Sequence, residues 1–100
     1  MNNTFDAGCI FLSTELMKMC KADVDFPSEI KRSITRFKNC DWGDIPPRYY
    51  YTNGTALDST GEIFASYPIT SHKYPDAHID VIQEERGDNT YLFYSEELKR

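Results

Sequence analysis

Apolar and polar residues alternate along the last 40 residues of the chain, and this pattern predicts a β-sheet. From Ile63 to Ile69 every second side chain is Ile, Ala, Tyr or Ile, as in a strand with one buried face. Alternation that places Ile79 and Val81 on one face predicts a second strand over residues 77–84, and a third is expected over 90–94. We expect a connecting loop at 70–76, a hairpin turn at 86–89 and a closing turn at 95–98.

Helical spacing replaces alternation in the first part of the chain. Ile30, Ile34 and Phe37 recur at intervals of four and three residues, which predicts a helix with one apolar face over residues 27–39. Pro27 suits the first turn of that helix, where its missing N–H is no loss. A shorter helix is predicted over residues 14–20, with Ser13 or Thr14 as its N-cap.

The remaining segments have weaker patterns. Residues 7–12 are apolar and predict either a buried strand or the approach to the first helix. Residues 39–53 are expected to be irregular, because Pro46-Pro47 cannot continue a helix and Asn53-Gly54 marks a turn. Residues 55–58 are expected to form one helical turn. The fold class predicted for residues 1–100 is a single two-layer α+β domain, with N-terminal helices packed on an antiparallel sheet of three to four strands.

Composition and charge narrow the class of protein. Apolar residues make up 40% of the chain and aromatic residues 14%, which disfavours intrinsic disorder. The formal net charge of −5 argues against a protein that binds nucleic acid over its whole surface. The 3 cysteines have no C-x-x-C spacing, and no apolar stretch is long enough to span a membrane, so we expect reduced thiols and a cytoplasmic protein.

Asp41-Trp42-Gly43-Asp44 begins a longer pattern. It is followed by Asn53, Ala56-Leu57, Gly61, the strand segment 63–67, the segment 79–82, and then Glu84, Arg86, Thr90 and Leu92. In order and spacing this pattern resembles a family of small, mostly uncharacterised proteins carried on bacterial plasmids, phages and other mobile elements, some of them labelled restriction–modification subunits. The chain departs from that family after the D-W-G-D, where Ile45-Pro46-Pro47-Arg48 replaces acidic residues, and in the penultimate strand, which lacks the family's Trp.

The D-W-G-D segment has two interpretations. Trp42 is expected to be a core residue and Gly43 to end the preceding helix, which makes both of them architecture. Asp41 and Asp44 are either an acidic contact patch or groups that cap and hold the loop, and the sequence leaves both open. A catalytic pair of carboxylates is disfavoured.

Acidic residues gather in the C-terminal half. They either dock on a basic partner, or mimic DNA phosphates, or keep an edge hairpin soluble. The resemblance to mobile-element proteins favours docking. The candidate partner-binding residues are therefore Asp41, Asp44, Asp76, Asp80, Glu84, Glu85 and Asp88, with Glu96 and Glu97 nearby in sequence.

The predicted helix 27–39 carries the main basic cluster. Its members Lys31, Arg32, Arg36 and Lys38 are candidates for nucleic-acid binding, with Tyr49 to Tyr51 as stacking groups. The preferred interpretation is the solvated face of an amphipathic helix.

Catalytic and metal chemistry have little support in the sequence. His72, His78 and Asp80 invite a metal hypothesis, but a site needs three or four convergent ligands. No signature marks Cys9, Cys20 or Cys40 as a nucleophile. We therefore expect no catalytic residue, no metal and no cofactor.

The leading functional expectation is a binding protein, not an enzyme. The resemblance implies a phage- or plasmid-borne accessory factor that inhibits or modulates a host protein complex, in the manner of an anti-CRISPR protein acting on a defence nuclease. The alternative is a small nucleic-acid-binding regulator that uses the basic helix, and a small metal-dependent hydrolase comes third.

Overall fold

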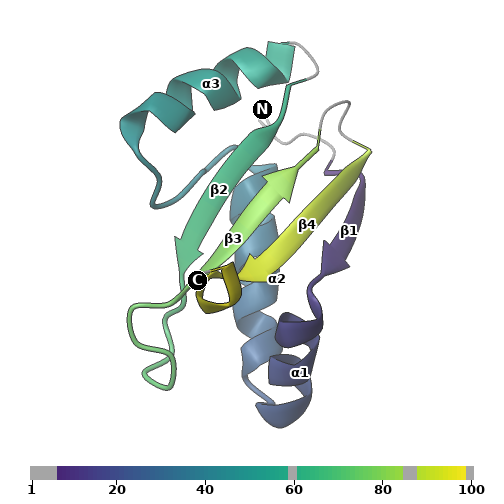
Figure 1. Ribbon diagram of the computed structural model, residues 1–100, viewed down its shortest axis with the longest axis vertical. Helices are drawn as coiled ribbons and strands as arrows, with labels where there is room; N and C mark the ends of the chain where they lie inside the picture. Colours follow the sequence, from purple (N-terminus) through teal and green to yellow (C-terminus); the bar gives the residue numbers. More distant parts are fainter. Residues whose placement is uncertain (1–6, 59–60, 85–87, 99–100) are drawn as a thin grey trace.

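Four strands form one sheet in the order β1-β4-β3-β2 (Figure 1). The structure is a computed structural model that describes residues 7–58, 61–84 and 88–98. The strands are β1 (Cys9–Leu12), β2 (Ile63–Pro68), β3 (His78–Gln83) and β4 (Asn89–Tyr94). The helices are α1 (Thr14–Ala22), α2 (Phe26–Lys38) and α3 (Pro47–Asp58), and a 3₁₀ turn, η2 (Ser95–Leu98), follows β4.

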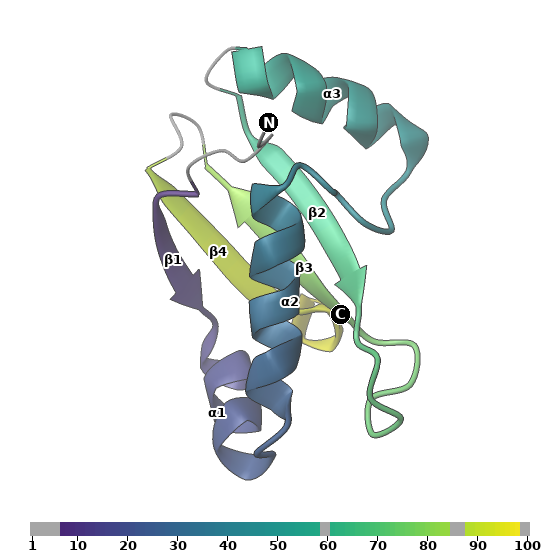
Figure 2. The same cartoon turned by 180° about the vertical axis from the view of Figure 1, so that it is seen from behind.

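Two layers enclose the core. Helix α2 lies across one face of the sheet with α1 at its lower end, whereas the opposite face is turned to the viewer in Figure 1 (Figures 1 and 2). Alternate strand residues such as Ala65, Val81 and Leu92 point toward α2 and are almost wholly buried. They meet Phe26 and Phe37 of α2 in one hydrophobic core. The predicted α+β class, with helices packed on one sheet face, is confirmed.

The sequence signals near the helix ends predicted the positions of α1 and α2 to within two residues. The hydroxyl of Ser13 accepts a hydrogen bond from the Leu16 N–H at 3.2 Å, so Ser13 caps α1 as predicted. Helix α1 runs two residues beyond its predicted end. Pro27 occupies the first turn of α2, which begins and ends one residue earlier than predicted.

Helix α3 contradicts the sequence prediction for its region. Residues 39–53 were expected to be irregular and 55–58 to form one turn, but one helix of 12 residues runs from Pro47 to Asp58. Pro47 is the first helical residue, where a proline is favoured because it donates no intrahelical hydrogen bond there. The Asn53-Gly54 pair lies inside the helix and makes no turn.

β1 settles the alternative left open for residues 7–12, because it is a strand and pairs in parallel with β4. The β2-β3-β4 meander is antiparallel as predicted. An edge hairpin, one of the alternatives for the acidic C-terminal hairpin, is wrong, because β3 and β4 lie inside the sheet between β2 and β1. The predicted turn residues 86 and 87 lie outside the described residues.

The outer edge of β2 is closed by the rest of the chain. The Asn53 side chain of α3 bonds both backbone groups of Phe64, donating to its C=O at 2.6 Å and accepting from its N–H at 3.1 Å. The Ser66 N–H donates to the Trp42 C=O at 3.1 Å, and the Ser66 C=O accepts from the Asp44 N–H at 2.7 Å. The unpaired groups of an edge strand invite pairing with other chains. Here they are bonded internally.

Among the described helices, none is long and apolar enough to cross a membrane.

Candidate functional site

The sheet face turned away from α2, here called the outer face, carries a continuous apolar row. Phe64 pairs with Ile82, Ile82 with Tyr91, and Tyr91 with Phe11, so the row crosses all four strands in register. The alternation of strand side chains puts these residues opposite the core. The sequence prediction assigned no role to this row, because its members come from four strands whose order was unknown.

The outer row is much less buried than the inner one. Phe11 is 48% exposed, whereas Val81 and Leu92 on the inner face are each 1% exposed. The rings of Phe11 and Tyr91 stack with centroids 5.4 Å apart. At the other end Tyr49 of α3 packs on Phe64, with ring centroids 5.4 Å apart. The row is therefore covered at β2, partly exposed at Ile82 and Tyr91, and most exposed at Phe11.

Acidic side chains stand on both sides of the row. Glu84, two residues beyond Ile82, lies with its carboxylate 3.4 Å from the Tyr91 hydroxyl. Asp80, two residues before Ile82, accepts a hydrogen bond from the Ser66 hydroxyl at 2.6 Å. Further along the same side, Asp44 contacts the outward-facing ring of His78 at 3.2 Å.

Basic side chains are scarce on this face. The outward positions of the four strands include no Lys or Arg. At the β2 end, Arg48 at the start of α3 places its guanidinium over the Tyr49 ring at 5.1 Å. The outer face thus combines exposed apolar surface with negative charge.

The two aspartates of the D-W-G-D segment have different environments. Asp41 accepts two hydrogen bonds from the Arg36 guanidinium, at 2.7 and 3.2 Å, and a third from the Gly43 N–H. The Arg36 hydrogen bond, helped by Gly43, holds the pKa of Asp41 below its usual value. Asp44 has a side chain that is 72% exposed. The Asp41 carboxylate is therefore engaged in hydrogen bonds within the loop, whereas the Asp44 carboxylate is accessible to solvent.

Trp42 and Gly43 are architectural, as predicted, but Gly43 has a different role. Trp42 is buried edge-on against Phe37 of α2. Gly43 was expected to end the helix, and this is wrong, because α2 ends at Lys38 and Gly43 bridges β2 with φ +74°. A Cβ on Gly43 would stand 2.2 Å from the Ser66 carbonyl oxygen, so this close approach requires glycine.

Tyr67 ties the same segment to the sheet. Its hydroxyl donates to the Asp41 C=O at 2.6 Å, and the Arg36 guanidinium lies 4.9 Å from its ring centre. Burial, together with the nearby Asp41 charge, raises the pKa of Tyr67 well above its usual value.

The remaining predicted partner-binding residues are spread along the outer face and beyond. Asp80 lies in the middle of β3, and Glu84 lies near the 88–89 end of the sheet. Asp76 lies in the loop before β3, and its exposed position has a positive φ of 60°. Asp88 is exposed at the start of β4, and Glu85 lies outside the described residues. The acidic residues therefore do not form the single hairpin cluster that the sequence suggested.

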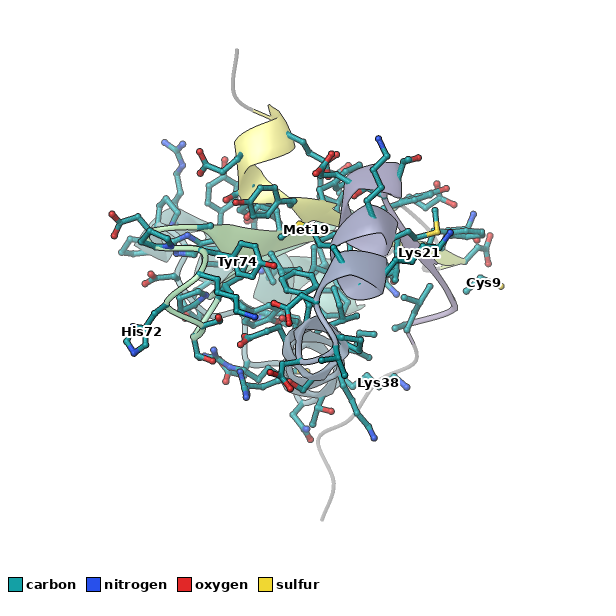
Figure 3. The ribbon with its side chains drawn as sticks, turned by 90° about the horizontal axis from the view of Figure 1, so that it is seen from below. Cys9, Met19, Lys21, Lys38, His72 and Tyr74 are labelled. Carbon is teal, nitrogen blue, oxygen red and sulfur yellow. The ribbon has the colours of Figure 1, made fainter. Side chains whose placement is uncertain are left out.

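The basic cluster lies on the opposite side of the molecule, along α2. Three of its members line a shallow depression of about 340 Å³ together with Ser28 and Thr35. Arg32 contacts Glu29 at 3.0 Å, and Arg36 is bonded to Asp41. Lys31 is the third basic residue that lines the depression. Lys38 lies outside the depression and points into solvent (Figure 3).

The residues considered for catalysis or metal binding do not converge. Figure 3 shows His72 pointing away from the body of the molecule, and Cys9 on the opposite side. In the part of the chain that the structure describes, no three His, Cys, Asp or Glu side chains could share a metal ion. Burial raises the pKa of the Cys20 and Cys40 thiols, which lowers the fraction of reactive thiolate.

Comparison with known proteins yields no relative: no family model, no curated protein and no solved structure matches this chain.

Proposed function

We propose that the chain is a binding protein that docks through its outer sheet face on a partner protein with a basic surface. The observation that carries this proposal is the partly exposed apolar row Phe64–Ile82–Tyr91–Phe11 between acidic side chains. Protein interfaces commonly combine an apolar centre rich in aromatic residues with a polar rim. Like charges repel, so the acidic rim disfavours stacking of two copies face to face and favours a basic partner.

The sequence resemblance supports a more specific partner. It suggests a mobile-element accessory factor in a bacterial cytoplasm, acting as an inhibitor or modulator of a host complex. A defence nuclease assembly, such as a CRISPR effector, has the basic surfaces that nucleic-acid binding requires, and an acidic protein complements them. We therefore propose inhibition of such an assembly by occupation of a basic surface, without catalysis.

The test is capture of partners by immobilised protein, with face variants and matched controls. Phe11→Ser and Asp44→Lys change exposed groups of the outer face. Val24→Ser likewise replaces an exposed apolar side chain by Ser, and Asp25→Lys makes the same charge reversal, both in the loop between α1 and α2. A partner that is retained by wild type and by both controls, lost with both face variants, and cross-linked to β3 or β4 supports the proposal. A partner retained equally by all five proteins, or cross-linked only to α2, contradicts it.

Nucleic-acid binding by α2 is the second candidate. It is favoured by the depression in which Lys31, Arg32 and Arg36 lie together with two hydroxyl side chains. The ion pairs with Glu29 and Asp41 partly neutralise the charges of Arg32 and Arg36. A salt-sensitive shift of labelled single-stranded DNA or RNA that is lost in Lys31→Glu supports this function. Absence of any shift at low salt excludes it.

A further inference from the structure

We propose that the partner element seated on the outer face is a basic amphipathic α-helix, laid across β3, β4 and β1 along the apolar row. This inference rests on the proposed function, because it names the kind of element that occupies the same surface. It follows from the length of the row, the spacing of the acidic side chains beside it, and the internal bonding of the β2 edge.

The row has the length of a short helical stripe. Neighbouring strands lie about 4.8 Å apart, so the three strands β3, β4 and β1 span roughly 10 Å from Ile82 to Phe11. A helix rises about 1.5 Å per residue, and roughly seven residues cover that distance. Apolar residues at i, i+4 and i+7 would then lie over Ile82, Tyr91 and Phe11.

The acidic residues are spaced to flank such a helix. Asp80 lies in β3, and Glu84, four residues later, directly follows the strand, so the two acidic residues stand on either side of Ile82. Four residues of a strand extend about 13 Å, and a helix with its side chains is about 10–12 Å wide. Lys or Arg on both flanks of the helix would therefore reach a carboxylate on each side. Asp44, with its exposed side chain, extends the negative charge on the Asp80 side.

Helix α3 covers the β2 end of the row. It runs obliquely beside the outer edge of β2 in both views, and its Tyr49 ring packs on Phe64, the first residue of the row (Figures 1 and 2). An incoming helix would contact the outward residues of the next three strands. Tyr49 and Arg48 would form the wall at its β2 end.

The edges of the sheet disfavour an added strand at β2. The Asn53 side chain is hydrogen-bonded to the backbone N–H and C=O of Phe64, and residues 42–44 are hydrogen-bonded to those of Ser66. Strand addition needs an edge with unpaired backbone groups. Recognition at the β2 side must therefore use side chains, which is how a helix docks.

A designed peptide tests the inference. The probe is a fluorescently labelled helix of about 14 residues, with Leu at i, i+4 and i+7 and Lys on both flanks. Its control is the same sequence with alternate D-residues, which keeps composition and charge but cannot form the helix. Binding is measured by fluorescence anisotropy at low and physiological salt.

The expected result is binding of the helical peptide and not of its control. Phe11→Ser should weaken binding by about tenfold, as loss of an apolar contact in an interface does. Asp44→Lys should weaken it mainly at low salt. Val24→Ser and Asp25→Lys should bind as wild type. Equal binding of the two peptides, or undiminished binding by Phe11→Ser, overturns the inference.

The two proposals fail differently. A captured protein that cross-links to β3 and β4, with no binding of the helical peptide, leaves the proposed function standing and refutes the helix. Peptide binding at the outer face without capture of any partner supports the helix and counts against the wider function.

Discussion

Asn53 of α3 satisfies both backbone polar groups of Phe64 with one side-chain amide, although the two residues stand on different elements. The Nδ2 group donates to the Phe64 C=O at 2.6 Å, and Oδ1 accepts from the Phe64 N–H at 3.1 Å. Asn53 is 1% exposed, so the amide that makes these two bonds is itself buried. The contact anchors α3 to the sheet edge.

Replacing Asn53 by Ala should destabilise the fold. The substitution leaves the Phe64 N–H and C=O without their partner, and an unsatisfied buried polar group costs about 1–3 kcal/mol. We expect a loss of about 2–4 kcal/mol in the free energy of unfolding, measured by urea denaturation. Thr52→Ala is the control, since Thr52 is exposed on the same helix and should change stability by less than about 0.5 kcal/mol. A similar stability for both variants would show that the amide contacts are unimportant.

Two glycines should respond in opposite directions to alanine. Gly43→Ala places a Cβ 2.2 Å from the Ser66 carbonyl oxygen at a φ of +74°, and should cost more than about 3 kcal/mol. Gly54→Ala lies within α3, where an added Cβ meets no atom within 4 Å. Alanine there should stabilise by about 0.5–1 kcal/mol through helix propensity. Thermal melts of the two variants check the sign, and a stabilised Gly43→Ala would contradict the close approach.

Stability should fall in acid because of Asp23 and Asp41. The Asp25 N–H, with help from Tyr74 and Lys73, lowers the pKa of Asp23, and the Arg36 guanidinium lowers that of Asp41. A lowered folded-state pKa contributes stability above the unfolded value, near 4, and this contribution is lost as the pH falls through the folded pKa. Urea titrations between about pH 6 and pH 2 should show the decline. Asp41→Asn should have a flatter profile, and an unchanged slope would exclude this carboxyl as a source.

Trp42 should report on the core. It is the only Trp of the chain, is 4% exposed, and packs edge-on against Phe37. Its emission should be blue-shifted relative to free tryptophan, and iodide should quench it weakly until the protein unfolds. Phe11→Ser on the outer face should leave the emission unchanged, whereas Phe37→Leu should shift it. Strong quenching in the folded protein would contradict the burial.

The sequence predicted those elements whose signals are local. The apolar spacing of Ile30, Ile34 and Phe37 identified α2, and alternation identified β2 and β3. Helix α3 escapes the sequence prediction because Pro46-Pro47 has two effects: a proline breaks a helix that precedes it but favours the first position of a helix that follows. The burial of Asn53 against Phe64 then overrode the turn tendency of Asn53-Gly54.

The sequence predicted the acidic residues of the candidate surface but not its apolar row. Asp44, Asp80 and Glu84 were chosen for their charge, and each lies on or beside the outer face. The apolar row could not be found, because it depends on the register of four strands. In particular, the pairing of Phe11 with Tyr91 joins residues that are 80 positions apart. No local pattern contains that information.

The β1–β4 pairing also sets the order in which the fold can be completed. During synthesis β1 leaves the ribosome first, but its partner β4 follows only after α1, α2, α3 and two further strands. The β2-β3-β4 meander can form from neighbouring segments, whereas β1 must close a long loop before it gains any pairing energy. β1 can therefore pair only after β4 has been made. Until then Phe11 and the core residues of α1 lack the cover that β4 provides, and exposed apolar surface of this kind favours aggregation.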